Sequence, residues 1–145
     1  MKISSGIFLH NIKTKRFLIL HPSGWYNKKA AWSIPKGRID KEVPEDQVAW
    51  MKLLRETALR ELKEETGISY YSASVALKYL GEQKYVTGKK ILHAFFFNTA
   101  VPESSIKIVL QDGENDDFKW VRVEELADYV HEAQIKFLPA ILKLL

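Results

Sequence analysis

The chain has 145 residues, of which 46% are hydrophobic and 28% are charged, and its formal net charge is +4. This length and composition fit one globular domain over residues 1–145. No apolar run is long enough to cross a bilayer, the N-terminus lacks the pattern of a signal peptide, and there is no cysteine for disulfides or thiolate metal sites. We therefore expect a cytoplasmic protein with no membrane partner, and the modest charge does not argue for a stable nucleic-acid partner.

The first part of the chain predicts two buried strands. Apolar residues run through residues 3–10 and again through 16–20, and the polar residues 11–15 between them suit a hairpin turn. Residues 21–29 then combine turn formers with aromatic and basic side chains. This loop is either a site that stacks on a base and neutralises a phosphate, or a solvated loop with a tryptophan packed beneath it.

A short motif, Trp-Ser-Ile-Pro-Lys-Gly, occupies residues 32–37. Pro35 favours an extended approach to the motif's end, and Gly37 lets the backbone come close to a ligand. Lys36 and Arg38 flank this glycine. The motif therefore predicts a close backbone approach beside two cations.

Residues 45–66 predict a helix because they contain few helix breakers, with Pro44 suited to the start and Gly67 to the end. The apolar residues of this segment fall on two different faces. The first face comprises Val48, Met51, Ala58, Leu59 and Leu62, and the second comprises Trp50, Leu53 and Leu54. We therefore expect two helical pieces with a bend near residues 52–55.

Three carboxylates project from the end of this predicted helix. Residues three and four apart on a helix share a face, so Glu61, Glu64 and Glu65 form one oxygen-rich edge. Their like charges repel, and the C-terminus of a helix disfavours anions. A divalent cation such as magnesium would relieve both effects, since it takes oxygen ligands from a few carboxylates and a substrate phosphate. The alternative is a solvated acidic end of the helix.

The next segment predicts a hairpin with a basic tip. Residues 74–86 and 91–100 are two long candidate strands joined by a short turn that contains glycine and lysines. Tyr85, Lys89 and Lys90 lie at or next to this tip. These three side chains either face a nucleotide or are simply solvated.

The last part of the chain predicts an acidic loop followed by helices. A short apolar run at residues 106–110 precedes the acidic residues 111–117. Helices are expected over residues 123–131 and 134–145, where apolar side chains recur at helical spacing.

Residues 60–68 read Arg-Glu-Leu-Lys-Glu-Glu-Thr-Gly-Ile. This stretch resembles the second half of the Nudix hydrolase signature and matches it at every specified position. The segment HPSGWYNKKAAWSIPKG at residues 21–37 is similar to a subgroup of bacterial predicted pyrophosphohydrolases, and its end resembles the diadenosine tetraphosphate hydrolases and diphosphoinositol phosphatases. The resemblance implies an α/β Nudix fold in which a mixed β-sheet is sandwiched between α-helices.

The resemblance also implies roles for individual residues. Glu61, Glu64 and Glu65 would bind one or more Mg²⁺ or Mn²⁺ ions, often with the carbonyl of Gly37 as a further ligand. Arg60 would orient Glu61. These residues form the catalytic and metal-binding centre that the resemblance implies.

Members of the family commonly add an acidic residue from a loop outside the signature. In the diadenosine tetraphosphate hydrolases it stands six residues before a tryptophan, and Glu114 stands six residues before Trp120. Glu114 is therefore the candidate for an additional metal ligand or a general base. Its rivals in the same loop are Asp112, Asp116 and Asp117.

The first half of the signature departs from the family pattern. The spacing from Gly37 to Arg60 exceeds that of the family by nine residues, and Lys52 stands where the family has a glutamate that helps to hold the arginine. Glu56, one helical turn before Arg60, is the expected replacement. Two further candidates, if the inserted residues loop out, are Glu42 and Glu45.

The resemblance and these residues together predict magnesium-dependent hydrolysis of a pyrophosphate bond in a nucleoside diphosphate-linked substrate. Metal ions would screen the phosphates and activate a water molecule, a carboxylate would accept its proton, and Lys36, Arg38 and the lysines of the hairpin tip would hold the flanking phosphates. We rank a dinucleoside polyphosphate, such as diadenosine tetraphosphate, as the first substrate. The alternatives are nucleoside triphosphates including oxidised ones, RNA caps, nucleotide sugars, diphosphoinositol phosphates, or a nucleotide-sensing domain without turnover.

Overall fold

The computed structural model describes residues 1–24, 30–69 and 76–145. Its strands are β1 (Lys2–Asn11), β2 (Arg16–Pro22), β3 (Lys36–Arg38), β4 (Lys78–Lys84), β5 (Lys90–Thr99) and β6 (Asn115–Arg122). Its helices are α1 (Gln47–Thr66), α2 (Val123–Tyr129), α3 (Glu132–Ile135) and α4 (Leu138–Leu142), with a short 3-10 turn, η3 (Glu103–Ser105). Part of the predicted aromatic and basic loop, residues 25–29, and the start of the predicted hairpin strand, residues 74 and 75, lie outside the described residues.

The strands form one mixed sheet around β1, in the order β4-β5-β1-β2-β6. β1 runs parallel to β5 and antiparallel to β2 and β3. β3 pairs with the first half of β1, where Gly6 opposes Lys36, and β2 pairs with its second half, where His10 opposes Phe17. The predicted hairpin is confirmed, because β4 and β5 are antiparallel neighbours.

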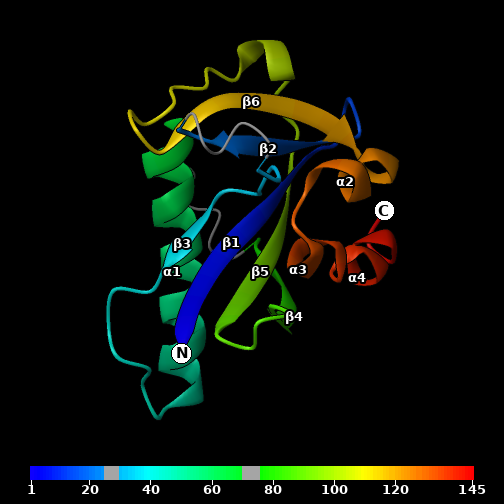
Figure 1. The fold of residues 1–145 in the computed structure, drawn as a ribbon. Helices are drawn as coiled ribbons and strands as arrows, with labels where there is room; N and C mark the ends of the chain where they lie inside the picture. Colours follow the sequence, from blue (N-terminus) through cyan, green and yellow to red (C-terminus); the bar gives the residue numbers. More distant parts are fainter. Residues whose placement is uncertain (25–29, 70–75) are drawn as a thin grey trace.

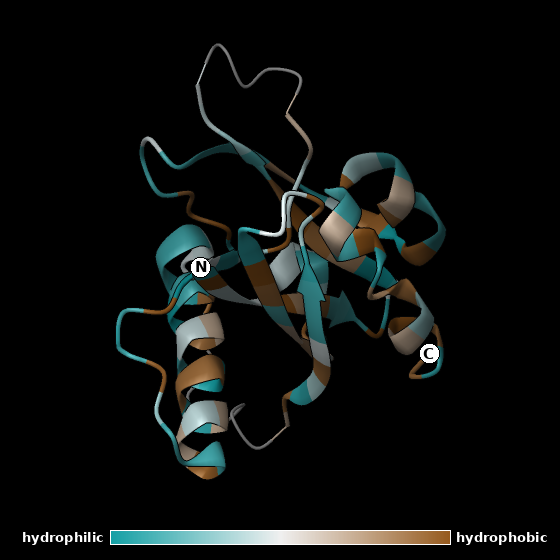
Figure 2. Cartoon of the chain, turned by 60° about the horizontal axis from the view of Figure 1, so that its bottom comes forward, coloured by the Kyte–Doolittle hydropathy of each residue, from teal (hydrophilic) through white to brown (hydrophobic). Residues whose placement is uncertain are grey.

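The sheet separates two hydrophobic cores because successive side chains of a strand point to opposite faces. Ile7 and Leu9 of β1 pack in one core with Leu62 of α1. Phe8 packs in the other core, with Phe137 beside α4. Figure 1 shows α1 on one side of the sheet and α2 to α4 on the other, and Figure 2 shows hydrophobic segments in the strands between these layers. The predicted sandwich of a mixed sheet between helices is confirmed.

Helix α1 runs without interruption from Gln47 to Thr66, so the expected break near residues 52–55 is wrong. Asp46 caps the start by accepting a hydrogen bond from the backbone N–H of Ala49, and Gly67 ends the helix in the left-handed conformation, with φ of 79°. The first apolar face does not extend into the first turn, because Val48 is 76% exposed, so burying Leu53 and Leu54 of the second face requires no bend. The buried side chains, which begin a turn and a half later, form a single stripe: Leu53, Leu54, Thr57, Ala58, Leu62 and Thr66.

The C-terminal part contains three short helices where two longer ones were expected. The predicted helix over residues 134–145 is divided between α3 and α4. Pro139 explains the division, since a proline has no backbone N–H to donate to the preceding turn and is tolerated only near a helix start. None of the described helices is both long and apolar enough to cross a membrane.

Candidate active site

Gly37 and Glu61 bring β3 and α1 together. Gly37 pairs with Ser5 on β1, and the Ser5 hydroxyl donates to the backbone carbonyl of Leu54 in α1 over 2.7 Å, so this face of the strands lies directly against the helix. The carboxylate of Glu61 lies so close to Gly37 that a β-carbon at position 37 would overlap its atoms. The sequence predicted that a ligand comes close to the backbone at Gly37, and the group that lies there in the structure is the Glu61 carboxylate.

The Arg60 side chain connects the end of β3 to the carboxylates of α1. Its Nη1 lies 2.7 Å from Asp40 Oδ2, and its Nη2 lies 3.3 Å from Glu61 Oε1 and donates to the Arg38 carbonyl over 3.1 Å. Burial lowers the pKa of Arg60, but the hydrogen bonds to Glu61 and Asp40 outweigh it and raise the pKa above its ordinary value. Arg60 is thus in contact with Glu61, the residue that it is predicted to orient.

The predicted partner of Arg60 is wrong. Glu56 pairs instead with Lys52, over 3.8 Å, on the exposed side of α1. The inserted residues loop out between β3 and α1, but neither of the two glutamates considered in that segment forms an ion pair with Arg60 in the described structure. Asp40 reaches Arg60 because it follows β3 by only two residues, at the point where the guanidinium already contacts the strand's backbone.

Glu65 is the most perturbed carboxyl group of the site. Burial raises its pKa, the charge of Glu61 raises it further, and a hydrogen bond from the Lys36 backbone together with the Lys36 charge offsets part of the rise, leaving a pKa of about 8. Burial also raises the pKa of Glu61, against the effect of its hydrogen bond with Arg60. Two partly buried carboxyl groups that repel each other are therefore held against one strand.

The remaining predicted acidic residues occupy different surroundings. Glu64 is half exposed and lies 3.9 Å from Arg60 Nε. Glu114 lies just before β6, where its carbonyl accepts from the Ser23 N–H, and its charge raises the pKa of both Glu61 and Glu65. The fold thus brings Glu114 within electrostatic reach of the carboxylates of α1, although they are far apart in the sequence.

Two of the rivals of Glu114 have local partners. Asp116 pairs with His21 Nδ1 over 2.8 Å, and the Asp117 carboxylate accepts from the backbone N–H of Phe118. Neither Asp116 nor Asp117 appears among the charges that raise the pKa of Glu65. Of the acidic residues in this loop, Glu114 is the one whose charge raises the pKa of Glu61 and Glu65.

The carboxylates are the type of ligand that a hard divalent cation prefers, but they do not form a complete metal site in this structure. Among the described residues, no three acidic or histidine side chains already converge as a complete metal site. Glu61 and Glu65 nevertheless place two carboxyl groups in a partly buried site beside Gly37 of β3, and a bound cation would favour the ionised form of both. A cation that keeps several waters and shares a few carboxylates with a substrate phosphate suits such an incomplete set.

The predicted phosphate-binding cations fall into two groups. Lys36 has a lowered pKa, because burial outweighs the charge of Glu65, and Lys90 lowers it further, so Lys36, Lys90 and the carboxylates lie within electrostatic reach. Arg38 is exposed at the end of β3, and Lys89 is exposed in the hairpin turn, where its carbonyl accepts from the Lys2 N–H. Lys36 and Lys90 are thus within electrostatic reach of each other, whereas Arg38 and Lys89 are exposed.

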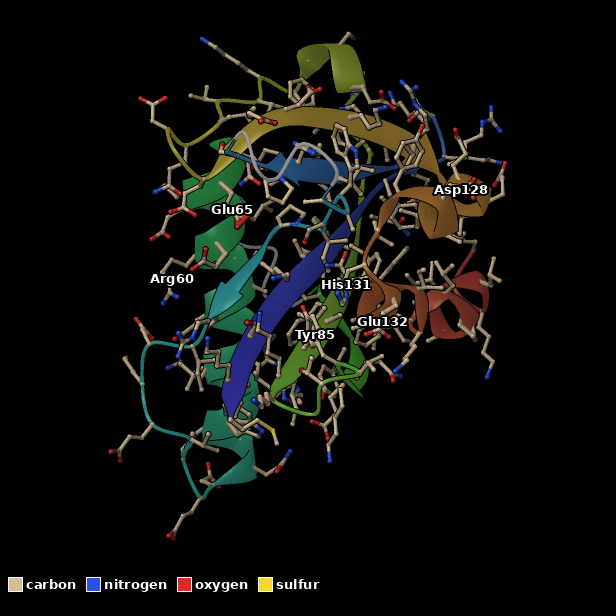
Figure 3. All side chains as sticks on the ribbon, in the orientation of Figure 1. Arg60, Glu65, Tyr85, Asp128, His131 and Glu132 are labelled. Carbon is tan, nitrogen blue, oxygen red and sulfur yellow. The ribbon has the colours of Figure 1, made fainter. Side chains whose placement is uncertain are left out.

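Tyr85 belongs to a cluster that the sequence did not reveal. Its ring lies 4.8 Å from that of His131, and the Val86 N–H donates to Glu132 Oε1 over 3.1 Å. Lys90 Nζ lies 5.7 Å from the centre of the Tyr85 ring. Figure 3 shows Tyr85, His131 and Glu132 together beside α3, while Arg60 and Glu65 lie at α1, on the other side of the strands. No spacing signal links the hairpin tip to residues 131 and 132, since only the fold brings them together.

A second aromatic group lies on the same face of the sheet. The Trp32 ring lies 6.2 Å from that of Tyr129, and Lys119 Nζ lies 4.9 Å from the former and 4.7 Å from the latter. Trp32 belongs to the Trp-Ser-Ile-Pro-Lys-Gly motif, but no sequence pattern joins it to Tyr129 or Lys119. Together with Tyr85, these side chains provide flat surfaces on which a base can stack.

The sequence is similar to proteins of known family. Residues 2–141 match the family model described as the NUDIX domain. The chain is 30% identical over 125 residues to Nudix hydrolase 6 of Arabidopsis thaliana, covering 86% of this chain and 40% of the relative. It is 29% identical over 123 residues to the asymmetrical bis(5'-nucleosyl)-tetraphosphatase of Mus musculus, covering 85% of this chain and 75% of the relative. The chain thus spans less than half the length of the Arabidopsis protein.

Solved structures share the same fold. A C. elegans Ap4A hydrolase binary complex superposes with a TM-score of 0.67 at 20% identity, covering 99% of this chain and 97% of the other. The NUDIX domain of Shewanella oneidensis NrtR, solved with ADP ribose, gives a TM-score of 0.68 at 16% identity, covering 99% and 88%. At such identities the likeness concerns the fold alone.

Proposed function

The chain belongs to the Nudix family, and from this premise we propose that it hydrolyses a pyrophosphate bond in a nucleoside diphosphate-linked substrate, with a dinucleoside polyphosphate such as diadenosine tetraphosphate ranked first. The observation that carries the proposal is the contact between the Glu61 carboxylate and Gly37, with Arg60 and the buried Glu65 on either side. This arrangement places carboxylates of the family's signature against the strand that precedes the insertion.

The residues that would hold the metal are Glu61, Glu64 and Glu65, with the Gly37 carbonyl and Glu114 as further oxygen ligands. A bound Mg²⁺ or Mn²⁺ ion would screen the phosphate charges and lower the pKa of a water molecule. Arg60 holds Glu61 in place through its hydrogen bond, and Asp40 fixes Arg60 from the other side.

Proton transfer needs a carboxylate that is accessible and near the charge cluster. Glu114 meets both conditions, since it is exposed and its charge acts on Glu61 and Glu65. We assign it the role of an additional ligand or general base. No covalent intermediate with the protein is required for this reaction.

Substrate phosphates would extend from the carboxylates toward the hairpin tip. Lys36 is within electrostatic reach of both Glu65 and Lys90, and Lys90 Nζ lies 5.7 Å from the centre of the Tyr85 ring, so we propose that the phosphates follow these groups across the sheet. Arg38 and Lys89 would bind outer phosphates at the two edges of this path. A base would stack on Tyr85, and a polyphosphate with a base at each end suits an extended path of alternating charge and aromatic surface.

The names of relatives favour the same ranking. The mouse relative is a bis(5'-nucleosyl)-tetraphosphatase, and the C. elegans neighbour in fold is an Ap4A hydrolase. The competing proposal is a nucleotide-sensing domain without turnover, which the insertion and Lys52 in place of the usual glutamate favour, and the NrtR domain with ADP ribose is a neighbour in fold.

The test is product analysis of the purified protein with Mg²⁺ across dinucleoside polyphosphates, nucleoside triphosphates, nucleotide sugars, capped RNA and diphosphoinositol phosphates. We expect preferred cleavage of diadenosine tetraphosphate, abolished by a chelator and restored by added Mg²⁺ or Mn²⁺. Preferred cleavage of another class would replace the proposed substrate and keep the reaction. Nucleotide binding without cleavage of any compound would overturn the proposed hydrolase activity and favour a nucleotide-sensing domain.

A further inference from the structure

A cavity of about 350 Å³ lies at the far end of β1 from the carboxylates. Its floor is formed by His10 of β1 and Asn98 of β5, which oppose each other in the sheet. His10 is five residues beyond Ser5, the partner of Gly37, which is about 16 Å along a strand. Figure 1 shows this end of β1 beside the end of β6 and the start of α2. The cavity therefore shares no residue with the proposed catalytic site and faces the opposite helical layer.

The floor presents a hydrogen-bond acceptor in an apolar setting. His10 is 5% exposed, and its ring packs on those of Phe17 and Phe96. Its Nδ1 lies 2.7 Å from Asn98 Oδ1, and because that oxygen can only accept, Nδ1 carries the proton. In the tautomer that this contact selects, Nε2 is the acceptor, and it forms no hydrogen bond within the described part of the chain. A fixed acceptor at the floor of a cavity selects a ligand with a hydroxyl or N–H group.

The walls and the mouth of the cavity differ in character. The walls are apolar side chains: Ile12, Val123, Leu144 and Leu145. Lys15 and Arg122 line it as well, and neither forms an ion pair with a carboxylate in the described structure. Glu124 is the one acidic side chain among these lining residues. Cations without partners next to an apolar cavity attract an anion that carries an apolar body.

From this combination we infer a second binding site, specific for a small anion with an apolar ring and a hydrogen-bond donor. The donor binds His10 Nε2, the ring packs on the apolar walls, and the carboxylate or related anion lies between Lys15 and Arg122. A volume of about 350 Å³ is within the range of small-molecule pockets and suits one substituted ring. The inference does not depend on the proposed catalytic function, since none of these residues belongs to that site.

The test uses 4-hydroxybenzoate as the probe, followed by ¹H–¹⁵N NMR of the full chain. We expect saturable shifts of the amides of Ile12, Asn98 and Val123, and no comparable shifts at Gly37. Two analogues separate the parts of the site: 4-methoxybenzoate lacks the donor and 4-hydroxybenzamide lacks the charge. Each should bind at least about fivefold more weakly, because each loses one hydrogen bond or ion pair. Absence of shifts up to solubility, or shifts centred on Gly37, would overturn the inference.

Two variants make the result specific to the cavity. Arg122→Gln should weaken binding of 4-hydroxybenzoate at least about fivefold but leave that of 4-hydroxybenzamide within about twofold. Lys52→Gln, which removes a cation from the exposed side of α1, is the matched control and should leave both unchanged. Equal affinity of the Arg122→Gln variant and the parent chain for 4-hydroxybenzoate would show that the anion does not use this cation and would contradict the site as drawn.

Discussion

The carboxylate of Glu61 lies against the Cα of Gly37, in the space that a side chain at position 37 would occupy. The glycine of the Trp-Ser-Ile-Pro-Lys-Gly motif is thus required by an intramolecular contact and not by an unusual backbone conformation, since Gly37 is absent from the glycines with positive φ. This contact joins the two sequence stretches that resemble the family signature. Its geometry makes the two residues energetically interdependent.

Gly37→Ala should displace Glu61 and lower activity by at least about a hundredfold. The clash itself can be isolated by a double-mutant cycle on the free energy of unfolding. Gly37→Ala should destabilise the parent chain by about 2 kcal/mol or more, and a Glu61→Ala variant far less, because the overlapping atoms are then gone. Chemical denaturation measures both values. Equal costs in the two backgrounds would mean that the contact does not constrain the site.

Glu64→Gln should reduce metal-dependent hydrolysis by several orders of magnitude while the fold is retained. Glu64 is half exposed, so the substitution removes a ligand charge and little packing. Glu56→Gln is the matched control: Glu56 lies two turns earlier on α1, pairs with Lys52, and should be neutral within about twofold. Turnover rates with Mg²⁺ and circular dichroism spectra check both variants. Near-normal turnover in Glu64→Gln would remove Glu64 from the metal site.

Asp40→Asn should lower activity by about tenfold, because Arg60 loses a charged partner at 2.7 Å and holds Glu61 less firmly. Asp40 is a positioning residue, so the loss should appear in kcat, with KM nearly unchanged. Restoring the carboxylate with Asp40→Glu should recover part of the rate. A change confined to KM would indicate instead that Asp40 acts on the substrate.

The metal-free protein should become less stable as pH rises from about 5 to 8. The pKa of Glu65 is about 8 in the fold against an ordinary value of 4.5, so between these values the folded chain keeps a proton that the unfolded chain has released. The free energy of unfolding therefore decreases with rising pH in this window, by an amount on the order of a few kcal/mol. Other groups titrate in this range too, and burial lowers the pKa of His93, which acts in the opposite direction.

The contribution of Glu65 is obtained by comparing the parent chain with Glu65→Gln in chelator at pH 5.5, 7 and 8.5. The variant should gain stability relative to the parent as pH rises, because it has no carboxylate to ionise. Added Mg²⁺ should stabilise the parent more at pH 8.5 than at pH 5.5, since the ion binds the ionised form. A constant difference between the two chains across this range would contradict the raised pKa.

Tyr85→Leu should raise KM for diadenosine tetraphosphate by about tenfold with a smaller effect on kcat, because it removes the stacking surface and keeps apolar bulk. Tyr79→Leu is the control. Tyr79 donates to or accepts from His93 on the α1 side of the sheet, away from Lys90 and His131, and its loss should leave KM unchanged. Steady-state kinetics distinguish the two, and equal KM values would remove Tyr85 from the substrate path.

Local patterns predicted much of the fold and part of the site. β1, β2, β4 and β5, the hairpin and the end of α1 at Gly67 follow from apolar runs and from glycine, which act over a few residues. β3 and β6 were not predicted, and β6 begins inside the expected acidic loop. The spacing of Glu61 and Glu65 likewise placed both side chains on one side of a helix. The errors arose where burial decides the outcome: the start of α1 is exposed, so its apolar residues did not demand a bend.

The partner of Arg60 shows why the rest could not be predicted. Glu56 was favoured because residues four apart on a helix are neighbours. This rule considers only the helix and does not include partners from the inserted segment between β3 and α1. Asp40 is the partner of Arg60 because the chain brings it there directly after β3, and this path depends on the pairing of β3 with β1. The cluster of Tyr85 with His131 depends in the same way on the packing of α3 against the hairpin.

The parallel pairing of β1 with β5 also has a consequence for how the chain acquires its fold. β1 precedes β5 in the chain by about eighty residues, and one of its edges stays without this backbone partner until residues 90–99 have been made. Pairings between segments so distant in sequence close a large loop and tend to form slowly. The strand pair that supports β3 is therefore completed late, and an incompletely synthesised chain exposes the unpaired edge of its most buried strand to aggregation.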